Sequence, residues 1–397
     1  MRILQLLEAA ATGAGRHVMD LSEGLLARGH EVHLLYSPLR CDRVFADDCK
    51  RLQSQRRFHP LPMPMERHPS AADIAVVARL RRYLRARGPF DLVHCHSTKA
   101  GLIGRAGLAG LAVKRLYTPH GFLSMDPAAG RAIARMAGGL EKVLTRLAAG
   151  VVVVSREEYA HAGALGIPRK NLRLIPNGVT RPRMDSLAKQ RSACRKEWGL
   201  EERDFCIGFA GRFIGVKAPE VMLDSFAAFL RRSRAPARLV MVGDGPLASS
   251  LHRRAADLGL TNEVIWVGAR DARPLMPGFD ALALTSNSEG HPLVVLEAMA
   301  RGLPIVATRV GGIADTIESG VNGFVAPVGD ADAIANALHE LACDRALRTR
   351  MGEASRALSL HFSADRMVEQ TLAFYQEIVS GVCADSTSAN LKMAASG

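Results

Sequence analysis

The chain has 397 residues, of which 48% are hydrophobic and 23% charged, a composition that predicts a soluble globular protein of two domains. No apolar run approaches the roughly 18 residues of a membrane-spanning helix, and the amino terminus reads as a strand and loop rather than a signal peptide. The net charge of +13 predicts attraction to anions, but only 5% of residues are aromatic and no base-stacking motif occurs, so nucleic acid is excluded as the expected partner. Seven scattered cysteines without a C-x-x-C pair indicate neither a disulfide framework nor a zinc site, and they fit a cytoplasmic location.

Strands and helices alternate from the amino terminus onward. We expect a strand over Arg2–Leu7, a helix over Arg16–Arg28 and a second strand over Glu31–Tyr36. The loop after the first strand carries Gly13 and Gly15, and such a Gly-x-Gly loop lets a ligand approach the backbone closely, although a tight turn also uses glycine. It is not a dinucleotide fingerprint, because the third glycine is absent and no acidic residue ends the second strand.

Basic residues gather in two predicted helices of the first half. After a stretch over Arg40–Pro69 that its prolines predict to be irregular, a helix is expected over Ala71–Arg87, and a later one over Ala128–Ala149. The arginines of the first are read either as a solvated helix face or as a contact with a membrane surface or a polyanion. The second helix either packs beside the sheet or faces a membrane.

Histidines follow two predicted strands of the first half. His94, His96 and Lys99 lie at the carboxyl end of a strand over Asp91–Cys95, and His120 follows a strand over Arg115–Thr118 on a glycine-flanked loop. The carboxyl ends of parallel strands face the ligand crevice of an α/β fold, so these residues are site candidates. A loop histidine is more often structural, and no acidic residue accompanies these histidines at metal-ligand spacing, so we expect no metal.

The turn over Pro176–Val179 marks the predicted domain boundary. It follows strands over Val151–Ser155 and Leu172–Ile175 and precedes the mostly polar stretch Arg181–Lys189, which resembles a linker. We therefore divide the chain into a first domain over residues 1–178, a second over 179–361, a helix within 362–381 and a polar tail over 382–397 that is expected to be disordered. Strand–helix alternation in both halves predicts an α/β fold with parallel sheets.

Two cations flank one predicted strand-to-helix loop of the second half. Arg212 and Lys217 lie between a strand over Phe205–Ala210 and a helix over Pro219–Arg231. Both can reach a single anion, and the helix N-terminus adds to the same field. The alternative is that they are two surface cations among the 52 of the chain.

A second loop carries acidic residues beside another helix N-terminus. Glu289 lies between a strand over Ala281–Thr285 and a helix that starts near Pro292, and Glu297 lies within that helix. Carboxylates repel phosphate but accept hydrogen bonds from sugar hydroxyls, so a nucleotide-sugar fits both the helix N-terminus and the acids. Because proline has no N–H, the amides of Gly290, Leu293 and Val294 are the expected phosphate donors.

The whole stretch resembles the donor-binding signature of family 4 of the retaining glycosyltransferases. The matching residues are Glu289, Glu297, Ala298-Met299, Gly302, Pro304 with Val306, and Gly311-Gly312. Further matches are the Gly-Arg-x4-Lys pattern at 211–217, the Gly-x-Gly loop at 243–246, His120-Gly121, Asn177-Gly178 and the first Gly-x-Gly loop. One departure is Gly290-His291-Pro292, where many members have Phe-Gly.

The resemblance implies a GT-B fold, two Rossmann-like domains with the site in the cleft and a last helix that crosses back onto the first domain. It implies that Arg212 and Lys217 bind the diphosphate, Glu289 and His120 the donor sugar and Glu297 the ribose, with Gly13, Gly15 and Gly243 near the ligand. The nucleotide-sugar, UDP- or GDP-linked, is a substrate, and neither a cofactor nor a metal is expected. The acceptor would attack from the front face, without a covalent intermediate.

The segments at 94–101 and 118–122 resemble those of members that build surface polysaccharides. They imply a saccharide or lipid-linked saccharide acceptor and a peripheral position at the inner face of the cell membrane, with its anionic surface as a further partner. A nucleotide-sugar epimerase and a non-catalytic nucleotide-sugar-binding protein of the same fold are the two alternatives. The Glu-x7-Glu signature argues against the first, and the presence of Arg212, Lys217 and Glu289 argues against the second.

Overall fold

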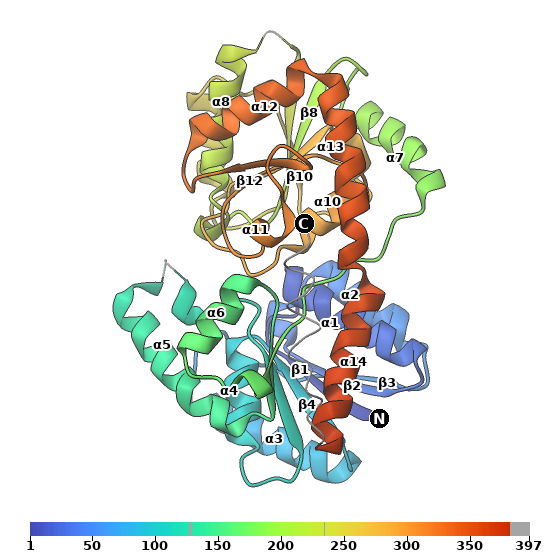
Figure 1. Cartoon of the computed structure of the whole chain (residues 1–397), viewed down its shortest axis with the longest axis vertical. Helices are drawn as coiled ribbons and strands as arrows, with labels where there is room; N and C mark the ends of the chain where they lie inside the picture. Colours follow the sequence, from blue (N-terminus) through green and yellow to red (C-terminus); the bar gives the residue numbers. More distant parts are fainter. Residues whose placement is uncertain (127–128, 234, 382–397) are drawn as a thin grey trace.

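The structure is a computed structural model that describes residues 1–126, 129–233 and 235–381. Figure 1 shows two α/β units stacked along the long axis, with the first half of the chain below and the second above. The tail over 382–397, predicted from the sequence to be disordered, lies outside the described residues.

The first unit is built on a parallel sheet of seven strands in the order β3-β2-β1-β4-β5-β6-β7. Its strands are β1 (Arg2–Leu7), β2 (Glu31–Tyr36), β3 (Phe58–Pro62), β4 (Leu92–His96), β5 (Lys114–Thr118), β6 (Gly150–Val153) and β7 (Leu172–Leu174). Its helices are α1 (Thr12–Ala27), α2 (Arg43–Gln53), α3 (Ala72–Arg87), α4 (Thr98–Gly107), α5 (Arg131–Leu144) and α6 (Arg156–Ala164). The register sets Leu7 beside Tyr36 and His96, and His96 beside Thr118, so these strand ends share one edge of the sheet.

The second unit is built on a parallel sheet of six strands in the order β10-β9-β8-β11-β12-β13. Its strands are β8 (Phe205–Ala210), β9 (Ala237–Val242), β10 (Val264–Gly268), β11 (Ala281–Leu284), β12 (Ile305–Thr308) and β13 (Gly323–Ala326). Its helices are α7 (Met184–Glu197), α8 (Pro219–Arg232), α9 (Ala248–Asp257), α10 (Leu293–Ala300), α11 (Ile313–Thr316), α12 (Ala331–Cys343) and α13 (Arg345–Leu358). Two parallel sheets with crossover helices confirm the fold class predicted from the sequence.

The last helix, α14 (Ala364–Ser380), belongs spatially to the first unit. Figure 1 shows it in red along the side of the lower sheet, directly after α13 of the upper unit. Val368 and Phe374 are buried in the same core as β1 and α1. A Cβ at Gly24 of α1 would lie 2.5 Å from Val368, so this close helix packing requires glycine.

Two stretches predicted to lack regular structure are helical or extended instead. The prediction for Arg40–Pro69 is wrong, because α2 and β3 lie within it; Asp42 caps α2 by accepting a hydrogen bond from the Phe45 N–H at 2.8 Å. Prolines 60 and 62 are tolerated in β3 because it is the edge strand of the sheet. The linker reading of Arg181–Lys189 is also wrong, since α7 starts at Met184 and buries its last turns against the second unit.

Candidate active site

The cation Lys217 and the carboxylate Glu289 meet at the carboxyl edge of the second sheet. They lie in the loops after β8 and β11, which are neighbouring strands. The Lys217 Nζ donates to Glu289 Oε1 at 2.5 Å, and the Ser286 hydroxyl donates to the same oxygen at 2.6 Å. The Asn287 N–H donates to the Val216 carbonyl at 2.8 Å, so the two loops are also tied through their backbones. The sequence predicted both residues for the site, and the fold brings them into direct contact.

Arg212 lies in the same loop as Lys217 but is solvent-exposed. Among the described residues its guanidinium has no hydrogen-bond or ion-pair partner. Partial burial lowers its pKa, and the nearby cations Arg40 and Arg67 of the first unit lower it further. Three guanidinium groups from both units therefore share one positive field, the arrangement that an anion such as a diphosphate stabilises.

The N-terminus of α10 faces the same region. Leu293 and Val294 open the helix, and N–H groups of a first helical turn have no acceptor within the helix. Gly290 precedes it and packs against the first unit, where a Cβ would lie 3.0 Å from Glu158 Oε1 and 3.5 Å from the Gly121 nitrogen. Gly290, the first of the three predicted amide donors, thus lies at the junction of the two units.

Glu297 lies one turn further along α10. Burial raises the pKa of its carboxyl to about 7, and Arg16 and Arg301 oppose that rise while Asp271 adds to it. Arg16 belongs to α1 of the first unit, so Glu297 lies near enough to the first unit to interact electrostatically with it. A carboxyl whose pKa lies near 7 can accept hydrogen bonds from ribose hydroxyls once it is ionised.

The predicted glycines differ in what surrounds them. Gly243 has a φ of +153°, and a Cβ there would lie 1.9 Å from the Gly211 carbonyl oxygen, so it lets the β9 loop rest on the Arg212 loop. Gly13 and Gly15 lie in the first turn of α1 rather than in the expected loop, because the helix begins at Thr12. A Cβ at Gly13 would meet nothing within 4 Å, whereas one at Gly15 would approach Ala10 and Phe45.

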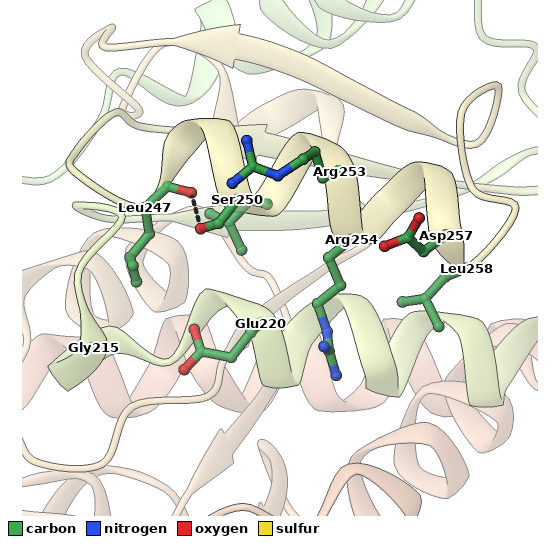
Figure 2. A pocket seen from close by; sticks show the side chains of 9 residues that line it. Gly215, Glu220, Leu247, Ser250, Arg253, Arg254, Asp257 and Leu258 are labelled. Carbon is green, nitrogen blue, oxygen red and sulfur yellow. Dashed lines mark hydrogen bonds between the residues drawn. The ribbon is translucent and has the colours of Figure 1, made fainter.

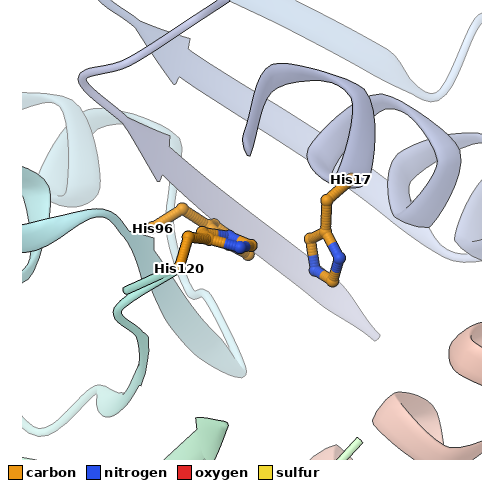
Figure 3. Close-up of side chains that lie close together, drawn as sticks. All are labelled: His17, His96 and His120. Atoms are coloured by element: carbon orange, nitrogen blue, oxygen red, sulfur yellow. The ribbon is translucent and has the colours of Figure 1, made fainter. Parts of the chain in front are cut away.

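His120 belongs to a group of three histidines at the carboxyl edge of the first sheet. Its φ is +53°, and its Nε2 lies 3.1 Å from the Nδ1 of His96. Figure 3 shows the rings of His96 and His120 lying one over the other beside His17 of α1. One nitrogen from each of the three lies within 4.8 Å of the others, a group that could hold a transition metal ion. In this structure His96 and His120 are instead hydrogen-bonded directly, and the absence of a metal from the reaction stays a prediction.

Lys99 does not join the histidines, although it follows the same strand. Its Nζ is buried in an ion pair with Asp73 at 2.6 Å and donates to the His68 carbonyl at 2.7 Å. It therefore anchors α4 to α3, and a structural role accounts for it.

Asn177 and His291 connect the two units, and sequence reasoning gave neither a role. The Asn177 N–H donates to His291 Nδ1 at 3.1 Å, and its side-chain amide donates to the His291 carbonyl at 2.7 Å. The Asn177 Oδ1 accepts from His17 Nδ1 at 2.9 Å. Two features of the sequence could have indicated a role: the Asn177-Gly178 turn matches the family, and His291 lies where this chain differs from many of its members. Together they tie the signature loop of the second unit to α1 of the first.

A separate surface pocket of about 540 Å³ lies between α8 and α9. Figure 2 shows that side chains of both helices line it, among them Glu220, Arg253 and Arg254. None of the predicted site residues lines this pocket. It lies on the helical face of the second unit, and of the Arg212–Lys217 loop only Gly215 lines it.

Two family models match the chain, one for each half. Residues 11–181 match the model described as Glycosyltransferase Family 4, and residues 190–358 match Glycosyl transferases group 1. A D-inositol 3-phosphate glycosyltransferase of Salinispora arenicola is 30% identical over 317 residues, which are 75% of this chain and 70% of that protein. The chain is a family 4 glycosyltransferase. This confirms the resemblance noted from the signature, and with it that the protein is an enzyme that transfers glycosyl groups.

Two further comparisons bear on this family 4 glycosyltransferase. A UDP-Gal:α-D-GlcNAc-diphosphoundecaprenol α-1,3-galactosyltransferase of Escherichia coli is 26% identical, over 73% of this chain and 76% of that protein. The crystal structure of Anabaena Alr3699/HepE in complex with UDP and glucose superposes with a TM-score of 0.80 at 21% identity, covering 95% of this chain and all of that one. The structural likeness supports the GT-B fold. Among the described residues, no helix is both long and apolar enough to span a membrane.

Proposed function

We propose that this enzyme moves a sugar, with retention of anomeric configuration, from a nucleoside-diphosphate sugar to a saccharide or lipid-linked saccharide acceptor. The observation that carries the proposal is the Lys217–Glu289 pair beside the exposed Arg212. This arrangement places cations that can bind a diphosphate next to a carboxylate that can accept hydrogen bonds from sugar hydroxyls. The HepE complex with UDP and glucose supports a UDP-linked donor; GDP is the alternative.

In the proposed reaction the cations stabilise the charge that grows on the leaving diphosphate. Arg212 and Lys217 would do this as preorganised groups, together with the amides of Gly290, Leu293 and Val294. Phosphate would share the Lys217 ammonium with Glu289, whose second oxygen has no hydrogen-bond partner among the described residues. Glu289 would then orient the sugar through its hydroxyls, and Glu297 would hold the ribose.

The test is a nucleotide-release assay with a panel of UDP- and GDP-sugars, followed by NMR of the product's anomeric proton. We expect one donor to be consumed faster when an acceptor is present, and an α-linked donor to give an α-linked product. Glu289→Gln keeps the shape of the side chain but removes its charge, and we expect it to bind nucleotide while losing turnover. A product of inverted configuration, or a free epimerised nucleotide-sugar, would refute the proposal.

We further propose that α5 docks on an anionic membrane, where a lipid-linked acceptor would lie. Four apolar side chains on this helix are solvent-exposed at helical spacing: Ile133 at 49%, Met136 at 70%, Leu140 at 45% and Val143 at 58%. Exposed basic residues accompany them: Arg131, Arg135 and Lys142 on the same helix, and Arg146 in the turn that follows it. An apolar row with flanking cations is the pattern of a helix that lies in a membrane interface. The lipid-linked acceptor in the name of the Escherichia coli relative supports the same location.

Sedimentation with vesicles tests this docking. We expect binding to phosphatidylglycerol vesicles that weakens with salt, little binding to phosphatidylcholine, and loss of binding in Met136→Asp. Val321→Asp is the matched control, because Val321 is an exposed apolar residue of the second unit. Equal binding by Met136→Asp and wild type would reject α5 as the docking element.

The division of the chain at 178/179, with residues 362–381 returning to the first domain, is also our proposal. The extents of the two sheets and the packing of α14 on α1 support it.

A further inference from the structure

A chain of hydrogen bonds leads from α14 to His120 through the core of the first unit. The Tyr375 hydroxyl of α14 contacts Gln5 of β1, whose amide contacts His96 of β4. His96 in turn contacts His120. Gln5, His96 and Tyr375 are fully buried, so protein partners and not solvent set the direction of each hydrogen bond.

The direction can be read from the Gln5 amide. Its Oε1 lies 2.7 Å from His96 Nε2, and its Nε2 lies 3.3 Å from the Tyr375 hydroxyl. The opposite orientation would force two nitrogens to 2.7 Å and stretch an O–H···O bond to 3.3 Å, both far from preferred lengths. Gln5 therefore accepts from His96 and donates to Tyr375.

The orientation of the Gln5 amide determines which atom carries each of the other protons in this chain of hydrogen bonds. Tyr375 accepts from Gln5, so its single proton goes to His94 Nδ1 at 2.5 Å, and His94 Nε2–H donates to Thr118 at 2.8 Å. His96 carries its proton on Nε2 and accepts on Nδ1. Burial lowers the pKa of His94, His96 and His120 well below the usual value, which keeps all three rings neutral. His120 must then donate from Nε2 to His96, and its Nδ1 is an unprotonated acceptor.

His17, like His120, has one unprotonated ring nitrogen, and a separate set of hydrogen bonds determines which one. Asn177 donates its side-chain amide to the His291 carbonyl, so its Oδ1 accepts from His17 Nδ1–H and the His17 Nε2 is left bare. The centroids of the His17 and His120 rings are 4.7 Å apart. Neither bare nitrogen has a hydrogen-bond donor among the residues whose side chains the structure describes. Two neighbouring acceptors without protein donors are suited to a ligand that supplies O–H groups.

We propose that Tyr375 and Gln5 act through His96 as positioning residues that hold His120 as the Nε2–H tautomer, so that His120 Nδ1 and His17 Nε2 accept hydrogen bonds from donor-sugar hydroxyls. This rests on the proposed function, because the sugar is the ligand that supplies the hydroxyls. It adds residues of β1 and of the last helix to donor recognition. It also gives His120 a fixed role as an acceptor.

Long-range ¹H–¹⁵N NMR of the ligand-free enzyme tests the tautomers without any substrate. We expect His94, His96 and His120 to carry their protons on Nε2, and His17 on Nδ1. In Tyr375→Phe the Gln5 amide loses its anchor, so the His96 and His120 signals should shift toward a mixture of tautomers. Thr371→Val is the matched control, because it removes another buried hydroxyl from the same helix without touching the histidines. An Nδ1–H tautomer of His120 in the wild type would overturn the proposal.

Calorimetry then separates recognition of the sugar from recognition of the nucleotide. We compare UDP with UDP-glucose, or GDP with GDP-mannose if the enzyme selects GDP, on wild type, Tyr375→Phe and Thr371→Val. We expect Tyr375→Phe to weaken nucleotide-sugar binding by roughly two- to tenfold, the value of one hydrogen bond, and to leave nucleotide binding unchanged.

Equal losses for nucleotide and nucleotide-sugar, or a loss in Thr371→Val as large as that in Tyr375→Phe, would show a merely structural role and overturn the proposal. A wild type that binds neither ligand would refute the proposed function instead. The tautomer measurement would still decide whether the hydrogen-bond path exists.

Discussion

The two sides of the cleft gather their residues in different ways. On the second unit, Arg212, Lys217, Glu289 and Glu297 lie in or beside two loops after neighbouring strands, and each loop is contiguous in sequence. On the first unit, the path to His120 collects β1, β4, α1, the loop after β5 and α14 from across the chain. A local signature can therefore be recognised in one stretch of sequence, whereas a hydrogen-bond network can be recognised only once the fold is known.

The largest effect should follow from removing a cation on the second unit. We expect Arg212→Ala to lower kcat by on the order of 10²–10³, the cost of losing one preorganised donor to developing charge. Steady-state kinetics with the selected donor measure this, and Arg231→Ala of α8 is the control because it removes an exposed arginine outside the site. A rise in KM with kcat unchanged would contradict the role of Arg212 in stabilising the leaving diphosphate, because a group that acts on the transition state must change kcat.

Glycines on the two sides should respond in opposite ways to a methyl group. Gly243→Ala places a Cβ 1.9 Å from the Gly211 carbonyl oxygen at a positive φ, and we expect it to destabilise the protein by roughly 1–3 kcal/mol. Gly13→Ala meets open space within a helix, so its stability should hold or rise by about 0.5–1 kcal/mol. Urea denaturation measures both; equal destabilisation would contradict this contrast between the two loops.

Glu297 of the second unit should make nucleotide binding depend on pH near neutrality. Burial holds the pKa of Glu297 at about 7, with Arg16 and Arg301 lowering it and Asp271 raising it; Asp20 across the cleft is held at about 7 as well. Below this pH Glu297 is protonated and loses acceptor capacity for ribose, so affinity should fall as pH drops from 8 to 6, by at most about tenfold per unit. Calorimetry in this range should show a flatter profile for Glu297→Gln. An unchanged profile would exclude Glu297 as the titrating group.

The smallest expected effect is that of metal removal. If Arg212 and Lys217 stabilise the leaving group, EDTA should leave kcat unchanged within error. A large loss of kcat that Zn²⁺ restores would instead make the group of His17, His96 and His120 a metal centre. Catalysis would then depend on the first unit as well as on the cations of the second.

The sequence allowed the fold class to be predicted, and with it the strands over Phe205–Ala210 and Ala281–Thr285 of the second sheet, because these buried apolar runs end at glycine or polar loops. It also predicted the Lys217 and Glu289 loops, since each motif lies within one strand–loop–helix unit. It missed α2 and α7, which have few apolar and many charged residues and lie near proline-containing segments that suggested loops. It could not place Tyr375 beside His94, because 281 positions separate them and only the return of α14 brings them together.

The role proposed for Arg212 and Lys217 is to bind the diphosphate of the donor. Calorimetric titration of UDP and GDP into wild type, Lys217→Ala and the control Lys196→Ala tests it most directly. We expect micromolar binding of one nucleotide to wild type and to Lys196→Ala, which removes an exposed lysine of α7, and loss of that binding in Lys217→Ala. Unchanged affinity in Lys217→Ala, or no binding of either nucleotide to wild type, would contradict the assignment.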